Sequence, residues 1–422
     1  MDDKTIKCET YNLHLIKTNK FKTILFKLIF RDDIKKEEIT IRNVLIDYLM
    51  FASNDYKTKK DLSRKKQDLY GASLYGYNKR IGNHHVTEIS LSILNPRYTE
   101  EIMFDESTNF LKQIILNPLV KNNTFDSEIL SIIKKSIESD IKEEKENPDS
   151  YASIKLKEMI AINAPFSYNL SGYLKDLEKI NCDTLYEYYK KFIKENIIDF
   201  YIVGDFDISA MENKIKEEFK FDNNKKELGN IKITYDDKKE LFFVEESKFN
   251  QTKLMLGCVP NNLTKKEQNS VLTLYNIILG NSPESKFFKN IREKNSYAYS
   301  ISSGFRKTDN LMIISSGISY KNHKKVINLI KQEMKEMLLG NFSEEELLRA
   351  KELYISVLKD IDEYQSSIID YFFGLSYIET QSIKKQIKTI KLITKEEIIN
   401  VASKINIAAI YILKEGKENE AN

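Results

Sequence analysis

The sequence is poor in the residues and patterns that mark several large classes of protein. It has three cysteines, four histidines and no tryptophan in 422 residues. No stretch approaches the roughly 18 consecutive apolar residues that a membrane-spanning helix needs. Residues 1–20 also lack the apolar core of a secretory signal. These absences predict a cytoplasmic protein that does not enter a membrane.

The cysteines do not form a pattern. Cys8, Cys182 and Cys258 are far apart and odd in number, which suits reduced thiols better than a disulfide framework or a zinc ribbon.

Charge of one sign is not in excess. There are 66 basic and 63 acidic residues, a net charge of +3, and the two signs alternate along the chain. A phosphate backbone is usually bound by a basic stripe, so nucleic acid is not predicted as a partner. Neither G-x-G-x-x-G nor the Walker pattern occurs, and nucleotide chemistry is not predicted either.

The histidines do not form a metal-binding pair. Two ligands on a helix must lie three or four residues apart to share a face. His14, His84, His85 and His323 offer no such helical pair, and we predict a surface or turn role for each. No G-x-S-x-G elbow occurs, and no cysteine is placed like a nucleophile.

What the chain does contain is enough apolar sequence for two cores. Hydrophobic residues make up 41% and charged residues 31%, as in a soluble globular protein. Single cores stop growing near 250–300 residues, so a chain of this length is expected to form two domains.

The two halves repeat one order of elements. In the first half, hydrophobic periodicity predicts a strand over 21–30, a helix over 38–51 and a second short helix that ends at 69–77. It then predicts a strand over 85–94 and helices over 99–115 and 125–145. The second half has matching segments over 251–259, 265–279, 284–293, 298–304, 311–319, 321–338 and 343–361. Each half ends in a helix and a strand, over 182–205 and 394–413.

This repeat predicts an α+β protein with two homologous domains. Each domain is expected to have a mostly antiparallel sheet with helices packed on one face. The predicted boundaries are 1–219 for the first domain, 220–240 for a polar linker and 241–422 for the second domain.

One segment of the second half carries a family resemblance. ILGNSPESKFFKNIREKNSYAYSISSG (278–304) resembles the second-half signature of the insulinase/pitrilysin zinc metallopeptidases, with R-E-K followed by A-Y-S on a strand. The repeat, IVGDFD (202–207) and residues 164–192 extend the resemblance over nearly the whole chain. It implies the short two-domain bacterial form, whose domains face each other as a clamshell.

The zinc motif of that family is degenerate here. The family carries H-x-x-E-H on the first long helix of the first domain, and the matching residues are VLIDY (44–48). Val44 and Tyr48 replace the histidines, and Asp47 replaces the general base. Valine cannot bind zinc and a neutral phenol binds it poorly. We therefore predict a core helix with no metal and a chain that does not cleave peptides alone.

The resemblance gives a role to Arg292 and Tyr299. In the family, an arginine and a tyrosine at this spacing contact the substrate backbone and the developing oxyanion at the zinc of the other domain or of a partner. The alternative is that Arg292 only complements the end of its helix and Tyr299 packs in the sheet. Tyr297 is a nearby tyrosine, but the spacing favours Tyr299.

The sequence therefore predicts a non-catalytic, substrate-binding subunit of a heterodimeric zinc metallopeptidase that acts on short or unfolded peptides. Zinc is expected in a sister subunit with an intact H-x-x-E-H, and no cofactor is expected in this chain. One alternative is a structural or scaffolding homologue, and another is a hydrolase with an unrecognised site. The resemblance does not extend to the glycine-rich loop of the mitochondrial processing enzymes, because LGNSPES contains a single glycine, Gly280. A targeting peptide is therefore not inferred as the substrate.

Overall fold

The chain forms two compact units, each built from more than one segment. The computed structural model describes residues 2–100, 102–161, 164–223, 227–229, 240–378 and 381–416. Unit 1 consists of Met1–Glu143, Asn169–Ile231 and Glu363–Phe373. Unit 2 consists of Glu144–Tyr168, Lys232–Asp362 and Gly374–Asn422.

Unit 1 is built on a six-stranded sheet. In spatial order its strands are β1 (Asp2–Lys7), β2 (Asn12–Lys17), β8 (Ile197–Gly204), β3 (Thr23–Asp33), β5 (His84–Leu94) and β4 (Ser73–Ile81). Neighbouring strands are antiparallel except β2 and β8, which are parallel. β4 is therefore an edge strand of this sheet.

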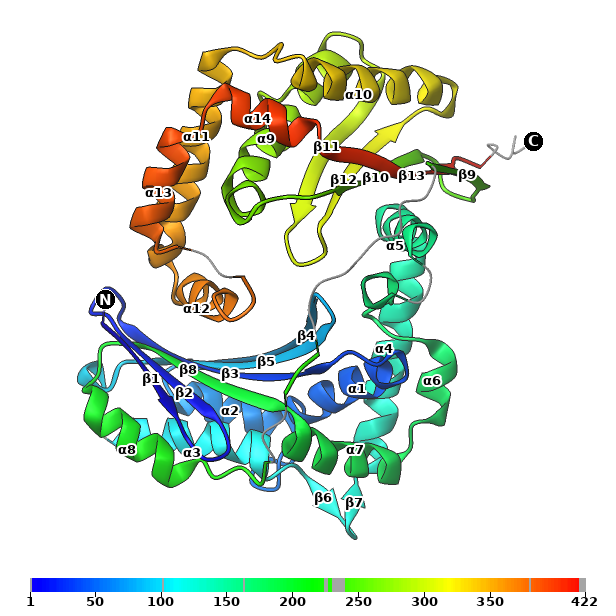
Figure 1. The fold of residues 1–422 in the computed structure, drawn as a ribbon. Helices are drawn as coiled ribbons and strands as arrows, with labels where there is room; N and C mark the ends of the chain where they lie inside the picture. Colours follow the sequence, from blue (N-terminus) through cyan, green and yellow to red (C-terminus); the bar gives the residue numbers. More distant parts are fainter. Residues whose placement is uncertain are drawn as a thin grey trace. The chain divides into compact units, whose positions relative to one another are not determined.

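Helices cover one face of this sheet and enclose the core of unit 1 (Figure 1). They are α1 (Ile39–Leu49), α2 (Lys59–Asp68), α3 (Ile102–Leu116), α4 (Ser127–Glu146), α6 (Leu174–Lys179), α7 (Cys182–Glu195) and α8 (Ile208–Glu218). A short hairpin, β6 (Val120–Lys121) with β7 (Thr124–Phe125), precedes α4. The apolar residues of α1 and α7 recur at helical spacing and are buried with those of the strands, which accounts for the single thick core.

Unit 2 repeats the arrangement on a five-stranded sheet. Its strands in order are β11 (Ala298–Arg306), β12 (Leu311–Ile318), β10 (Thr252–Pro260), β13 (Ile405–Lys414) and β9 (Leu241–Glu246). Only β13 and β9 are parallel. When the strands are followed from β4 in unit 1 and from β11 in unit 2, both sheets have three antiparallel pairings and then a parallel one. The predicted repeat and the α+β class are confirmed.

The core of unit 2 lies between its sheet and a second set of helices. These are η4 (Glu267–Val271), α9 (Leu272–Leu279), η5 (Phe288–Glu293), α10 (His323–Leu338), α11 (Glu344–Lys359), α13 (Ile383–Leu392) and α14 (Lys395–Ala402). Ser343 and Thr394 close capping boxes at the starts of α11 and α14, which fixes where these helices begin.

Each unit also contains a helix from the other half of the sequence. α5 (Pro148–Ile160) belongs to unit 2, where Ala152 and Leu156 are buried against Met255 and Tyr411 of the sheet. α12 (Gln365–Gly374) lies on the sheet of unit 1, on the face away from α1 (Figure 1). The predicted boundaries at 219 and 241 divide the chain continuously, whereas the compact units are discontinuous because both helices bury their apolar sides on distant strands.

The chain between α2 and β4 differs from the prediction. The segment 69–77 was expected to end a helix, but α2 ends at Asp68 and β4 begins at Ser73. Tyr70 and Gly71 have φ of 56° and 77°, and such left-handed backbone ends a helix. Most of the predicted linker, residues 224–226 and 230–239, lies outside the described residues.

In the described part of the chain, no disulfide bond joins Cys8, Cys182 or Cys258. Within the described residues, no helix combines the length and apolar character that a bilayer crossing requires.

Candidate functional site

The degenerate zinc motif lies on α1, inside unit 1. Val44 and Tyr48 are one helical turn apart and share a face, and both are fully buried in the core. This face packs into the hydrophobic core, as is typical of an amphipathic helix.

Tyr48 is held by hydrogen bonds to the backbone. Its Oη donates to the carbonyl oxygen of Leu119 and accepts from the amide of Asp126, both at 2.8 Å. Its ring stacks on Phe125 at 4.1 Å between centroids. Burial raises the pKa of the phenol, which keeps it neutral. With an aliphatic Val44 and an engaged, neutral Tyr48, these positions do not fit a zinc ion.

Asp47 lies on the same helix, and its side chain is partly buried. Burial first, and then the charge of Asp140 on α4, raise the pKa of this carboxyl to about 6, while Lys59 acts in the opposite sense. Asp47, Lys59 and Ser136 line an open hollow of about 240 Å³. Two carboxylates are too few for a metal centre, and the described residues contain no group of three or more metal-binding side chains.

Sequence reasoning did not single out Asp140. It lies in the run ESDIKEEKE, where seven of nine residues are charged, and such a run is typical of a solvated helix face. Only the packing of α4 beside α1 makes Asp140 a neighbour of Asp47.

Arg292 and Tyr299 both lie at the junction of η5 and the edge strand β11. Arg292 is exposed on η5, and its guanidinium lies over the ring of Phe288 at 4.7 Å from the centroid. Among the described residues, no carboxylate is within ion-pairing distance of it. Ser296, with φ of 51°, turns the chain between the two elements.

A β-bulge determines how Tyr299 is presented. Ala298 pairs with Ile318 and Ser300 with Gly317, so Tyr299 is the extra residue on β11. A bulge re-aims the side chain it carries, and Tyr299 is 65% exposed. The alternative in which Tyr299 packs in the sheet therefore does not describe this residue.

Tyr297 is placed differently from Tyr299. Its ring is partly buried against the core of unit 2, and Lys325 lies over it at 5.0 Å. Two tyrosines two residues apart thus have separate environments, one structural and one open to solvent.

The matching edge strand of unit 1, β4, is also lined with exposed aromatic side chains. Tyr75 and Tyr77 are about 40% exposed and stack with their ring centroids 6.4 Å apart. The Tyr77 Oη donates to Glu88 at 2.6 Å. Each unit therefore has an accessible sheet edge that bears tyrosine.

Glu88 anchors a buried charge cluster beneath this edge. Its carboxylate lies 3.0 Å from Lys27 Nζ and also forms an ion pair with Lys79 of β4. Burial would raise the pKa of Glu88, but the two lysines lower it below its ordinary value. Asp370 of α12 lies 3.4 Å from Lys27 Nζ, so α12 completes the cluster.

Two histidines depart from the predicted surface or turn role. His84 and His85 on β5 are 4% and 1% exposed. Burial, followed by the charge of Arg42, holds the pKa of His85 well below its ordinary value. The strand over 85–94 was predicted, but the burial of these two histidines was not. Residues 84–91 of β5 are all buried, so neither face of the strand is open to solvent there.

Comparison with known proteins bears on these sites. Residues 179–354 match the family model described as the peptidase M16 inactive domain. The second half of the chain thus resembles a domain of the M16 family. The matched range includes Arg292 and Tyr299, and the predicted resemblance to the insulinase family, in a form without an intact zinc motif, is confirmed.

Two relatives extend the similarity over most of the chain. The chain is 26% identical to the "Probable inactive metalloprotease YmfF" of Bacillus subtilis over 415 residues, which is 95% of each chain. It is 21% identical to the "Non-peptidase homolog YmxG" of Helicobacter pylori, over 75% of this chain and 73% of that protein. These similarities support a non-catalytic member of the family.

Solved structures share the two-domain M16-like fold. A conserved protein from Enterococcus faecalis superposes with a TM-score of 0.93 at 25% identity, over 100% of both chains. A peptidase M16 inactive domain from Pseudomonas fluorescens gives a TM-score of 0.78 at 16% identity, over 98% of both chains. The fold of this chain thus occurs in proteins of several bacteria.

Proposed function

We propose that this chain is the non-catalytic, substrate-binding subunit of a heterodimeric zinc metallopeptidase. Its sister subunit would carry the intact H-x-x-E-H and the zinc, and the substrates would be short or unfolded peptides. This chain would supply Arg292 and Tyr299 to the shared site.

The observation that carries the proposal is the exposure of Tyr299 on a bulge beside an exposed Arg292. Burying large aromatic side chains is favourable, yet Tyr299 stays 65% exposed at a bulge that leaves the next residue, Ser300, exposed as well. An exposed donor pair at a sheet edge is suited to a ligand that is not part of this chain.

The packing of α1 supports a catalytic zinc elsewhere. Val44 and Tyr48 occupy the core with side chains that do not fit zinc, so this chain offers substrate contacts without a metal site of the family type. The sister subunit is therefore assigned the metal chemistry, and this chain the binding and orientation of the peptide.

The edge strands β4 and β11 suit the binding of an extended peptide. Such a peptide can add to a sheet edge through main-chain hydrogen bonds, which are largely independent of its sequence. The exposed tyrosines of the edge that the peptide joins, Tyr75 and Tyr77 on β4 or Tyr299 on β11, would then flank the added strand. This mode fits a broad class of unfolded peptides better than one folded substrate.

Arg292 and Tyr299 would act as hydrogen-bond donors to the peptide carbonyl. A guanidinium and a phenol both donate and do not require a change of protonation. Donors that are aimed at developing negative charge contribute about 2.7–4 kcal/mol each in favourable cases.

The test is peptidase activity of the chain mixed with a sister subunit that carries H-x-x-E-H. We expect each protein alone to be inactive on quenched fluorescent peptides and the mixture to be active. Arg292→Ala and Tyr299→Phe should each lower kcat/KM of the mixture by about 10²-fold or more.

The matched controls are Arg64→Ala and Tyr98→Phe, which alter exposed residues of unit 1. They should leave activity and thermal unfolding unchanged. Full activity of the Arg292 and Tyr299 variants would remove their assigned roles. A mixture that forms a stable complex but remains inactive on all peptides would favour the structural or scaffolding alternative.

A further inference from the structure

An apolar groove lies on unit 2, between the end of α9 and the first turns of α11. Its volume is about 380 Å³, and Ile277, Ile278 and Ala350 form its buried floor. Leu353 lines the wall and is 43% exposed. Val357, one helical turn further, is 56% exposed. The apolar surface thus continues out of the groove along one face of α11.

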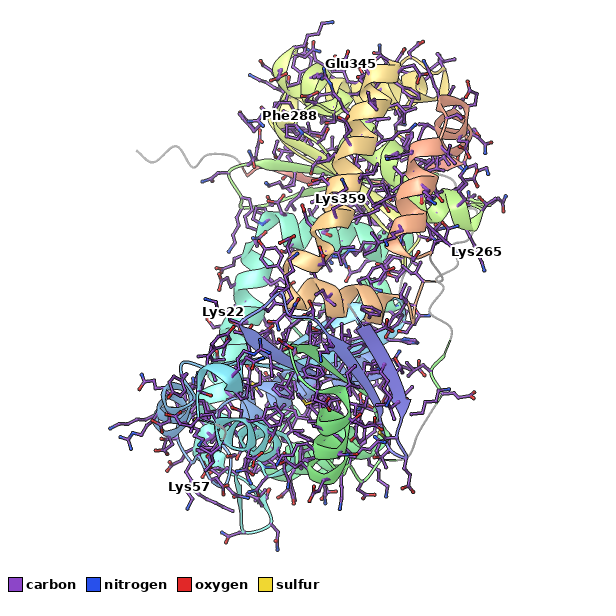
Figure 2. All side chains as sticks on the ribbon, turned by 90° about the vertical axis from the view of Figure 1, so that its left-hand side faces the viewer. Lys22, Lys57, Lys265, Phe288, Glu345 and Lys359 are labelled. Carbon is purple, nitrogen blue, oxygen red and sulfur yellow. The ribbon has the colours of Figure 1, made fainter. Side chains whose placement is uncertain are left out.

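This apolar stripe is unusual for its helix. α11 has the sequence EEELLRAKELYISVLK, and its other exposed positions are mostly charged or polar. Figure 2 shows α11 on the surface between the labelled Glu345 and Lys359. Contiguous exposed apolar surface with a polar rim is typical of a contact surface.

The rim of the groove is acidic. Glu284, Glu346 and Glu352 line it together with one cation, Arg349. The guanidinium of Arg349 is already neutralised by ion pairs with Glu284 and Glu345. Glu346 accepts a hydrogen bond from the Ser343 amide at 2.8 Å, which leaves its charge in place.

The carboxylates of Glu346 and Glu352 on the rim favour a cationic ligand over a neutral or anionic one. Glu352 is exposed, and no ion pair to it occurs among the described residues. A ligand with only apolar groups would remove water from these carboxylates without compensation, which is costly. A ligand that brings lysine or arginine to the rim would complement it.

The shape of the groove favours a helix over a small molecule. Small-molecule sites bury most of the ligand, whereas here Pro283, Glu284, Glu352 and Leu353 are all exposed along one side. An amphipathic helix inserts apolar side chains at i, i+3, i+4 and i+7 into such a groove and keeps its polar face in water.

We propose that this groove docks a cationic amphipathic helix of a partner protein. Two or three apolar side chains of that helix would fill the space above Ile277, Ile278 and Ala350 and continue over Leu353 and Val357. Lysine or arginine residues flanking them would pair with Glu346 and Glu352. The proposal does not depend on the peptidase role of Arg292 and Tyr299.

The probe is a synthetic amphipathic peptide made of leucine and lysine, with leucines at i, i+3, i+4 and i+7. A second peptide, in which glutamate replaces every lysine, is the charge control. Isothermal titration with the full chain should give a saturable one-to-one complex with the lysine peptide and at least tenfold weaker binding of the glutamate peptide. Added salt should weaken the complex, because the rim charges are exposed.

Two groove variants and two matched controls locate the site. Leu353→Asp and Glu352→Lys should each weaken binding at least tenfold. Leu392→Asp changes another exposed leucine, which is on α13, and Glu217→Lys makes the same charge change on α8; both should bind like the wild type. All four positions are on the surface, and equal thermal unfolding of the variants would show that they fold.

Several results would overturn the proposal. These are equal binding to all four variants, equal binding of the two peptides, and no binding of the lysine peptide to the wild type. Self-association of the chain that Leu353→Asp abolishes would also contradict it, because a second copy would then occupy the groove.

Discussion

At the scale of single residues, the negative charge of Asp47 lowers the stability of the folded protein, because the carboxylate is partly buried. Its folded pKa of about 6 is above the ordinary value of 3.8, so the folded protein binds this proton more tightly than the unfolded chain does. Stability from this group is therefore highest below about pH 4. It falls as the pH rises toward 6 and stays lower above that.

Replacing Asp47 by asparagine removes the charge and keeps the size. We expect Asp47→Asn to raise the free energy of unfolding by about 1–2 kcal/mol at pH 7.5, and by less at pH 5. Urea unfolding at the two pH values measures this difference. Asp55→Asn, at an exposed position, should change stability by less than about 0.5 kcal/mol. A gain that is equal at both pH values would show that the pKa of Asp47 is not the cause.

Tyr299 shows how one inserted residue can alter a surface. Without the bulge, the alternation of β11 would have continued from buried Ala298 through an exposed and then a buried position. With it, Tyr299 and Ser300 are both exposed before Ile301 returns to the core. Residue type alone does not predict this presentation, because the bulge depends on how β11 pairs with β12.

At the scale of elements, α12 is a helix whose position depends on contacts with strands distant in sequence. Gln365 Nε2 donates to the carbonyl oxygens of Thr23 and Val203 at 2.9 and 2.8 Å. Phe373 is 2% exposed and packs edge to face on Tyr201, with Arg31 over its ring at 5.4 Å. A ten-residue helix is marginal in isolation, so these contacts decide where it lies.

Shortening Phe373 should release this helix. Phe373→Ala is expected to lower the free energy of unfolding of unit 1 by about 3–5 kcal/mol, because it removes a buried aromatic ring. Amide hydrogen exchange in residues 365–374 should then become faster. The neighbouring Phe372 is only partly buried, and Phe372→Ala should have a clearly smaller effect. Equal effects of the two variants would mean that Phe373 does not anchor α12.

At the scale of the whole molecule, each half of the sequence contributes one helix to the unit that the other half mainly builds. α5 follows α4 in the first half but packs on β10 and β13, and α12 follows α11 in the second half but belongs to unit 1. Lys253 Nζ and Asp149 form an ion pair at 2.8 Å, and the Tyr151 Oη donates to Glu245 at 2.6 Å. Each half of the sequence therefore lacks part of the unit that it mainly builds.

Separating the halves should expose the surfaces that these helices bury. We expect fragments 1–229 and 240–422, prepared separately, to bind the dye ANS and to unfold without a sharp transition. The apolar residues Leu156 and Phe373 would be left without their sheets. Mixing the fragments should restore a cooperative transition and reduce dye binding. Two fragments that each unfold cooperatively without dye binding would show that the exchange is dispensable.

Much of the fold could be predicted because its signals are local. Strand alternation and helical periodicity extend over a few residues, and they placed most of the repeated strands and helices. The end of α2 was misplaced because the left-handed backbone of Tyr70 and Gly71 gives only a weak signal in the sequence. The site was less predictable. Arg292 and Tyr299 followed from a pattern, whereas Asp140 and the burial of His84 and His85 depend on elements distant in sequence.

The sequence by itself determined the repeat, the α+β class and the loss of zinc ligands at Val44 and Tyr48, since each of these depends on residue type and short spacing. Only the tertiary structure decided which helices complete which sheet, which carboxylate faces Asp47, and that Tyr299 is turned to solvent. The physical reason is that burial, strand register and the pKa of a carboxyl are set by neighbours that the chain brings together from far apart.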